Sequence, residues 1–188
     1  MKETRFINIR AEQSADNNDL ILTGRAIVFN SITKINDPMG SYFEIVESGA
    51  LDGADLSDVR LLYNHDTNKL PLARAPKTLA LTVDKEGLFF KALLPDTEEA
   101  RAVYTAVKRG DLDGCSFAFT IDKGGDIYDP KTNTRTIKKI KKLYECSICV
   151  FPAYTKTSVE ARSVITASKK KYIARQSALE MIETILTK

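Results

Sequence analysis

The sequence predicts an α+β fold, in which an antiparallel sheet or barrel is accompanied by a few helices. Short runs of alternating apolar and polar residues, separated by turn residues, fill the first two thirds of the chain, which is typical of antiparallel strands. The segment 95–110 has the periodicity of a helix and a capping residue at each end. Apolar residues also recur at helical spacing after residue 157.

The predicted strands are bounded by turns rich in Gly, Pro, Asn and Asp. The segment 20–30 is expected to form either a pair of strands or one bent strand, with a turn or bulge at Gly24. Two alternating runs joined by residues 84–87 predict a hairpin. Loops are expected at 35–42 and 122–134. In chain order, strand segments are expected at 5–12, 20–30, 42–51 (ending in a turn or short helix), 59–66, 78–94, 114–121 and 135–151, the last as one long or two short strands.

The clearest helix is the segment 95–110. Asp96 is its expected N-cap, with Glu99 three residues further on, and Gly110 provides the C-terminal stop. Its apolar face is formed by Ala100, Val103 and Val107. A helical tail is expected from about residue 157, from the spacing of Ala174, Ala178, Met181, Ile182 and Ile185.

Length, composition and charge exclude several classes of protein. The 188 residues suffice for one globular domain, with 43% apolar and 28% charged residues. The net charge of +3 is too small to indicate nucleic-acid binding, and the basic runs 135–142 and 169–171 are typical of solvated faces or tails. No apolar run approaches the roughly 20 residues of a membrane span, and the N-terminus lacks the apolar core of a signal peptide. The three cysteines, an odd number, argue for a reducing compartment.

A thiol and a hydroxyl stand side by side at the start of the strand 114–121. Alternation places Cys115 on a uniformly apolar face, with Phe117, Phe119 and Ile121. Ser116 lies on the opposite, small and partly polar face, with Ala118 and Thr120. Cys115 is therefore predicted to be a buried structural residue and Ser116 the accessible one, although a serine in a strand is by itself most often structural.

Two further residues gain interest from their setting. His65 is the only histidine of the chain and lies at a strand end beside a turn, where active-site residues often occur. A hydrogen-bonded structural histidine is the alternative. Glu145 is the one carboxylate in the uncharged run 143–151, where its same-face neighbours are expected to be Leu143, Ser147, Cys149 and Phe151. A lone buried carboxylate needs a partner, either a histidine ring or, at a surface position, the lysines just upstream.

Cys146 and Cys149 form a C-x-x-C pair, but the context does not favour a metal or redox site. There is no second pair, and the two thiols are expected on opposite faces of one strand. A redox C-x-x-C normally opens a helix, and this one lies within a β run. No glycine-rich phosphate loop is present, so no cofactor or metal is predicted.

Read in order, the blocks GRAIVFNS, VRLLYNHD, the run from LPLARA to GCSFAFTI, and KKLYECSICVFPAYTKTSVEAR resemble the tailed-phage prohead proteases, which are related to herpesvirus assemblin. The resemblance spans about 23–162. It implies a serine endopeptidase domain over 1–163 with a herpesvirus-protease-like antiparallel β-barrel flanked by helices, and a helical basic tail over 164–188. Two departures are Ala73, where the family commonly has glycine, and Cys115 before the serine, where family members vary.

The resemblance also assigns roles. The family's nucleophile falls on Ser116, its general base on His65 and its acidic third member on Glu145. It implies cleavage of scaffold protein, of scaffold-like segments of the capsid subunit, and of the protease itself, inside the immature capsid in the host cytoplasm. No nucleic acid or membrane is required, and a homodimer or higher oligomer is possible. The alternatives are a non-catalytic assembly module that binds coat subunits and a cysteine hydrolase using Cys115 and His65.

Overall fold

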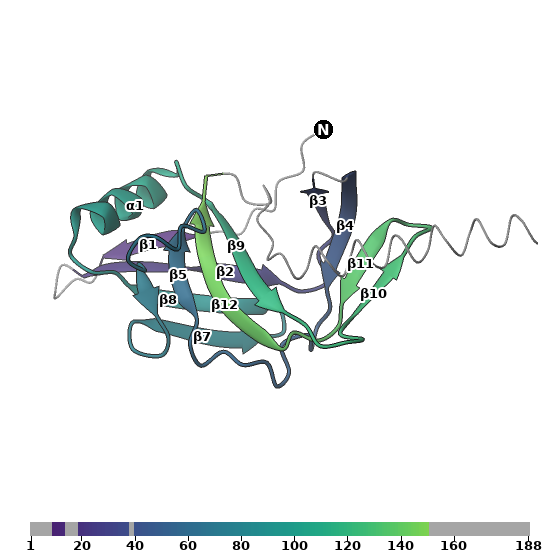
Figure 1. The fold of residues 1–188 in the computed structure, drawn as a ribbon. Coiled ribbons are helices and arrows are strands. Elements are labelled where there is room, and N and C mark those ends of the chain that lie inside the picture. The colour runs from purple at the N-terminus through teal and green to yellow at the C-terminus, as the bar shows by residue number, and fades with distance from the viewer. Residues whose placement is uncertain (1–8, 14–18, 38–39, 151–188) are drawn as a thin grey trace, which may run out of the picture.

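The computed structural model describes residues 9–13, 19–37 and 40–150, in which the strands form three four-stranded sheets with a single helix (Figure 1). The sheet orders are β1-β2-β8-β7, β10-β11-β4-β3 and β6-β5-β12-β9. The elements are β1 (Arg10–Gln13), β2 (Leu20–Val28), β3 (Thr33–Asp37), β4 (Gly40–Val46), β5 (Arg60–Tyr63), β6 (Ala73–Arg74), β7 (Leu79–Asp84), β8 (Gly87–Leu93), α1 (Glu98–Arg109), β9 (Gly114–Thr120), β10 (Asp126–Asp129), β11 (Thr134–Ile137) and β12 (Lys142–Cys149).

The first sheet contains the predicted hairpin, β7 and β8, joined at residues 84–87. Gly87 has a φ of 146°, and a Cβ built on it would lie 1.9 Å from the carbonyl oxygen of Ile27 on β2, so only glycine permits this approach. The segment 20–30 contains one strand, β2, which ends at Val28, and its irregularity lies between Arg25 and Ile27 instead of at Gly24. The ring of Phe90 packs against Gly24, and a Cβ at this position would lie only 3.0 Å from the ring.

The first sheet and the β6-β5-β12-β9 sheet share one hydrophobic core. In Figure 1 the strands β9 and β12 cross the first sheet at an angle, and β9 contacts β2. Fully buried aliphatic side chains from both sheets fill the space between them, which is the strongest stabilising contribution available to a domain of this size. They include Leu22, Leu88, Leu61, Leu143 and Ile148.

The helix α1 contacts β1 and β2 and buries Ala100, Val103, Tyr104 and Val107. Its C-terminal stop at Gly110 is confirmed, because that residue adopts the left-handed conformation with φ 81°. The predicted N-cap is corrected by one residue. Thr97, with extended backbone, accepts a hydrogen bond from the amide of Ala100, whereas Asp96 pairs with the guanidinium of Arg101.

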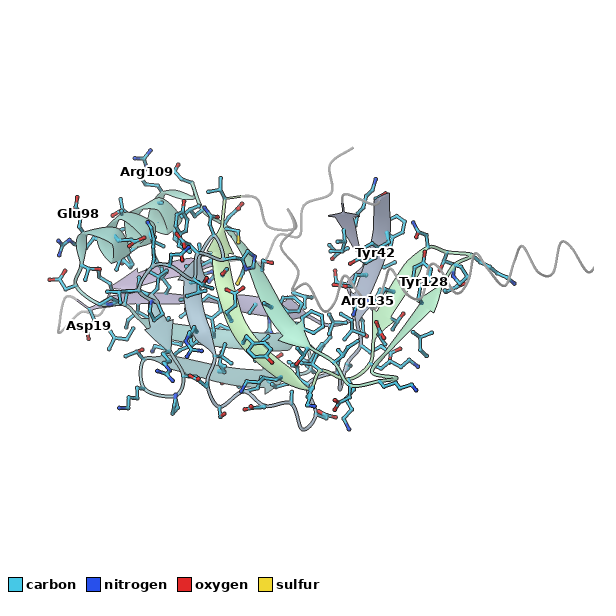
Figure 2. All side chains as sticks on the ribbon, in the orientation of Figure 1. Asp19, Tyr42, Glu98, Arg109, Tyr128 and Arg135 are labelled. Atoms are coloured by element: carbon cyan, nitrogen blue, oxygen red, sulfur yellow. The ribbon has the colours of Figure 1, made fainter. Side chains whose placement is uncertain are left out.

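The β10-β11-β4-β3 sheet lies apart from α1, as the labelled Tyr42, Tyr128 and Arg135 show against Glu98 and Arg109 (Figure 2). It corrects two predicted loops, because 35–42 contributes to the β3–β4 hairpin and 122–134 contains β10. Arg135 is fully buried and is held by Glu44 (3.0 Å) and Asp126 (2.7 Å). The buried charge therefore has carboxylate partners from both neighbouring strands, as burial requires.

The α+β class is borne out in the coarse sense of a mostly sheet protein with one helix among the described residues. The antiparallel barrel is corrected. The described strands form three open sheets, and two pairings are parallel, β11 with β4 and β12 with β5. The run 135–151 divides at 138–141, so that its two strands enter different sheets. Ala73 lies in β6, paired with Leu61. The predicted tail helix and the boundary at 163 lie outside the described residues.

Candidate active site

The strand β12 carries the centre of the site, because it lies between the strands that hold the other candidate residues. It pairs antiparallel with β9 and parallel with β5. Directly paired residues point to the same face, so Ser116, Ser147 and Leu62 form one row across the three strands. Glu145 lies two residues from Ser147 on the same face, in the neighbouring row with Ala118 and Arg60.

The two faces of β9 have the characters that alternation predicts. Cys115, Phe117 and Phe119 are buried in the hydrophobic core, whereas Ser116 and Ala118 on the other face are half-buried. This confirms the prediction that Cys115 is a buried residue. The hydroxyl of Ser116 and the carboxylate of Glu145 therefore lie on one face, away from the aromatic core.

A bulge in β12 corrects the predicted surroundings of Glu145. The register shifts between Leu143 and Glu145, which inserts Tyr144 without a partner. Leu143 consequently pairs with Phe119 and points into the core, while Glu145 turns to the face of Ser147 and Cys149. Strict alternation had placed Leu143 beside Glu145, and it fails here because it assumes an unbroken ladder. Phe151 lies outside the described residues.

His65 stands in a tight turn after β5. Asn64 and His65 both adopt left-handed backbone conformations, with φ of 52° and 59°, which are uncommon for non-glycine residues although Asn and His adopt them more readily than most. Contacts with β12 stabilise this turn. The amide of Asn64 donates to the carbonyl of Ile148 (2.9 Å), its side-chain oxygen accepts from the amide of Val150 (3.2 Å), and the amide of His65 donates to Ser147 Oγ (3.2 Å).

The turn directs the ring of His65 back onto Glu145. Nδ1 of His65 contacts Oε1 of Glu145, and the two side chains are only 14% and 10% exposed. The second carboxylate oxygen of Glu145 accepts a hydrogen bond from the hydroxyl of Ser147. The carboxylate thus has the histidine partner that its burial calls for, and both of its oxygens are engaged. Because Nδ1 faces Glu145, Nε2 is the ring nitrogen that does not contact the carboxylate.

The electrostatic setting of His65 favours its protonated form. Burial lowers the pKa of the imidazole. Hydrogen bonds to the side chains of Cys149 and Glu145, together with the charge of Glu145, raise the pKa by more than burial lowers it. The balance raises the pKa from 6.5 to about 10. A histidine with such a pKa binds its proton through the neutral range and yields it only in alkaline solution.

The predicted site residues are brought together to different degrees. His65 and Glu145 are in direct contact. Ser116 is placed on the same face, opposite Ser147, but the hydrogen bonds of the described residues do not include one between its hydroxyl and His65. Sequence reasoning placed Ser147 on the face of Glu145 but assigned it no contact with the site, and it did not consider Asn64. The position of Ser147 two residues after Glu145 was the signal that could have revealed its contact.

The three thiols lie in different surroundings, and all are buried. Burial raises the pKa of Cys115 and of Cys146, so neither is a reactive thiolate. Cys146 points into the core and Cys149 toward His65, which confirms that the C-x-x-C thiols face opposite ways. Within 9–13, 19–37 and 40–150, no group of three metal-ligating side chains is gathered, and no helix is long and apolar enough to cross a membrane.

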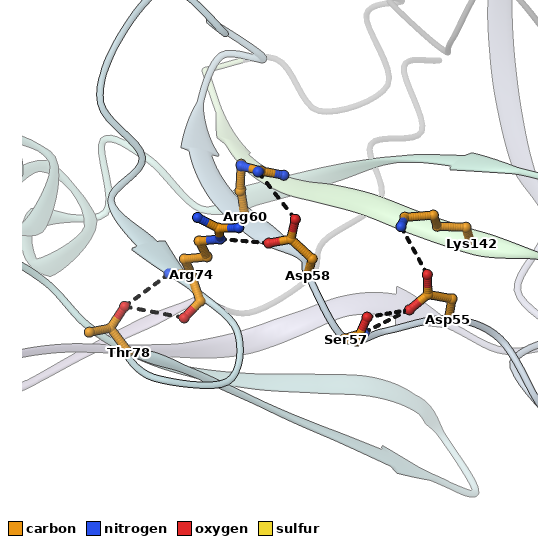
Figure 3. Close-up of polar contacts among 7 residues, drawn as sticks. All are labelled: Asp55, Ser57, Asp58, Arg60, Arg74, Thr78 and Lys142. Carbon is orange, nitrogen blue, oxygen red and sulfur yellow. Dashed lines mark hydrogen bonds and ion pairs between the residues drawn. The ribbon is translucent and has the colours of Figure 1, made fainter.

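Charged side chains of β5, β6, β12 and the segment 55–58 form a set of ion pairs (Figure 3). Arg60 pairs with Glu145 in the strand register, yet its guanidinium reaches Asp58 (3.2 Å), which also receives Nε of Arg74 (2.6 Å). Further along, Lys142 forms an ion pair with Asp55 (2.9 Å). Arg60, Arg74 and Lys142 are therefore engaged by Asp58 and Asp55. The side-chain contacts of Glu145 are with His65 and Ser147.

The raised pKa of His65 has a measurable consequence. If His65 is a general base, kcat/KM for peptide cleavage should rise with pH from about 7 towards about 10, as the neutral imidazole forms. Folding stability should change in the opposite sense. A folded pKa above the unfolded value of 6.5 stabilises the fold fully below pH 6.5, and this contribution disappears as the pH rises through about 10.

An NMR titration of the imidazole measures this pKa directly, because the chain has a single histidine. Glu145→Gln supplies the control, since removing the charge should move the midpoint back towards 6.5. A midpoint at or below 6.5 in the unmodified protein would contradict the prediction.

An accessible serine hydroxyl on the same face as a histidine–carboxylate pair is the set of groups that serine hydrolases use. The comparison with known proteins agrees with this class. The family model described as caudovirus prohead serine protease matches residues 6–171, and the chain therefore belongs to that family, as the sequence motifs predicted. The chain is 28% identical over 165 residues to the prohead protease of Enterobacteria phage HK97. This match covers 86% of the chain and 68% of the phage HK97 protein. No solved structure matches the chain.

Family membership confirms the predicted activity class. The chain is a capsid-maturation protease of the serine type. This result favours the protease over a non-catalytic assembly module. It also disfavours a cysteine hydrolase, and the burial of Cys115 in the core argues against that alternative independently.

Proposed function

We propose that Ser116, His65 and Glu145 form the catalytic triad of this protease. The observation that carries the proposal is the contact of His65 Nδ1 with Glu145, whose strand β12 places Ser147 directly opposite Ser116. The strand register thus keeps the nucleophile on the face of the histidine–carboxylate pair. The burial of both members of that pair supports an orienting role, because a buried carboxylate fixes the ring more firmly than an exposed one.

The chemistry follows from which atoms are engaged. Glu145 accepts the Nδ1 proton and so holds the tautomer in which Nε2 carries a lone pair. Nε2 takes the hydroxyl proton of Ser116 as Oγ attacks the scissile carbonyl carbon, and then delivers that proton to the leaving amine. Water hydrolyses the acyl-enzyme by the same route, and Glu145 stabilises the imidazolium in both halves of the reaction. Each step uses only these side chains and water, so this mechanism requires no cofactor.

We further propose that the substrates are those that the family resemblance implies: scaffold protein, scaffold-like segments of the capsid subunit, and the protease itself, inside the immature capsid in the host cytoplasm. The catalytic domain is proposed to comprise 1–163, followed by a basic tail at 164–188. A relation to the herpesvirus protease fold is part of the same proposal.

Co-expression of the full chain with the capsid and scaffold proteins of its own phage tests the proposal. The unmodified chain should shorten one of these proteins, whereas His65→Ala should leave them intact because the base is lost. Mass spectrometry identifies the new termini. Cleavage that persists in the His65→Ala variant would remove His65 from the mechanism. An unmodified chain that cleaves neither protein would refute the proposed substrates.

A further inference from the structure

We propose that Ser147 is a positioning residue that fixes both the carboxylate of Glu145 and the backbone of His65. The inference rests on the proposed triad and adds a fourth member that touches neither the substrate nor the reacting atoms. It comes from the hydrogen bonds of one hydroxyl, which connects the two sides of the histidine–carboxylate pair.

The hydroxyl of Ser147 uses its one proton and one of its two lone pairs. It donates its hydrogen to Oε2 of Glu145 and accepts the backbone N–H of His65 at 3.2 Å. The residue is completely buried, so water cannot replace either bond. A hydroxyl that donates one hydrogen bond and accepts another cannot rotate freely about its C–O bond. Both partners are consequently held in one geometry.

The two bonds control different parts of the same contact. The donated bond occupies the second oxygen of Glu145, so the carboxylate cannot rotate away from His65 Nδ1. The accepted bond satisfies the amide of His65, whose left-handed backbone with φ 59° takes it out of the strand ladder. Without that acceptor, a partly buried N–H would lack a partner and the turn would lose its tie to the centre of the strand.

The position of Ser147 in the sheet extends its influence to the nucleophile. Ser147 lies between Leu62 on β5 and Ser116 on β9 in one register row. The side chain is therefore in the middle of the three strands that carry the triad. Asn64 reinforces the same arrangement, since it bonds to the backbone of Ile148 and Val150.

Ser147→Ala tests the inference, because it removes both bonds and leaves a small cavity. Loss of a hydrogen bond to a charged group corresponds to about a 10- to 100-fold decrease in rate, which we expect in kcat, with KM nearly unchanged. Ser147→Cys fills the cavity but donates poorly, so it should fold well and be similarly slow. Thr120→Ala is the matched control, since it removes a hydroxyl from the same face of β9, outside the row of Ser147, and should cleave normally.

A spectroscopic measurement separates this inference from the proposed triad. In the Ser116→Ala background the imidazole Nδ1 proton of the single histidine should give a sharp, far-downfield NMR signal. Adding Ser147→Ala should broaden or shift that signal, whereas Thr120→Ala should not. If the signal changes but the unmodified chain cleaves nothing, the positioning role stands and the proposed triad fails. If both Ser147 variants cleave normally, or the signal is unchanged, the inference is wrong.

Discussion

Replacement of Ser116 by alanine should abolish cleavage of the capsid or scaffold substrate. Loss of the nucleophile from a serine triad typically lowers kcat by about 10⁴- to 10⁶-fold, because no other group forms the acyl-enzyme. The fold should be unaffected, since Ser116 is half-buried and its small side chain lies away from the core. Single-turnover cleavage of a purified substrate, with thermal unfolding measured in parallel, checks both expectations.

Cys115→Ala is the matched control for this result. The thiol lies one residue away on the opposite face, 3% exposed, and burial raises its pKa. Its loss removes core contacts, so we expect a destabilisation of about 1 kcal/mol with little change in kcat. A variant set in which Cys115→Ala is inactive while Ser116→Ala cleaves would establish the thiol as the nucleophile and overturn the assignment of Ser116.

Glu145→Gln should have the second largest effect, a decrease in kcat of about 10³- to 10⁴-fold. The amide can donate a hydrogen bond to Nδ1, which favours the tautomer whose Nε2 already carries a proton and cannot serve as a base. The substitution also removes the charge that stabilises the imidazolium. Measuring kcat together with the NMR titration of His65 separates the loss of the base from a general loss of structure.

Glu44→Gln provides the comparison for that experiment. Glu44 is also buried and also paired with a cation, Arg135, but it belongs to the β10-β11-β4-β3 sheet. Its replacement should lower the free energy of unfolding, because Arg135 loses a charged partner, while leaving kcat of the folded protein unchanged. Equal losses of kcat in the two variants would show that Glu145 acts through stability alone.

Much of the local structure could be predicted from the sequence. The β7–β8 hairpin, the end of α1 at Gly110 and the opposite facing of Cys115 and Ser116 follow from turn chemistry, capping and alternation. These features depend on neighbours within a few residues. The N-cap was misplaced by one residue because Asp96 and Thr97 are both good caps, and the choice depends on where the first helical turn begins.

Pairings between distant segments could not be predicted in the same way. The run 135–151 shows nothing that assigns its two halves to different sheets, and the parallel pairing of β12 with β5 depends on how the sheets pack. Strict alternation also failed at Tyr144, where the bulge turns Leu143 into the core. A bulge is decided by the fit between two strands, which neither strand reveals alone.

The sequence by itself determined the family and the three candidate residues, through ordered motifs, a single histidine and one carboxylate in an uncharged strand. The tertiary structure decided how these residues meet. It brought Glu145 to the ring of His65, folded His65 into a left-handed turn, and placed the hydroxyl of Ser147 between them. The contacts of His65 with Glu145 and Ser147 join residues 80 and 82 positions apart in the chain, and only the pairing of β5 with β12 brings them within hydrogen-bonding distance.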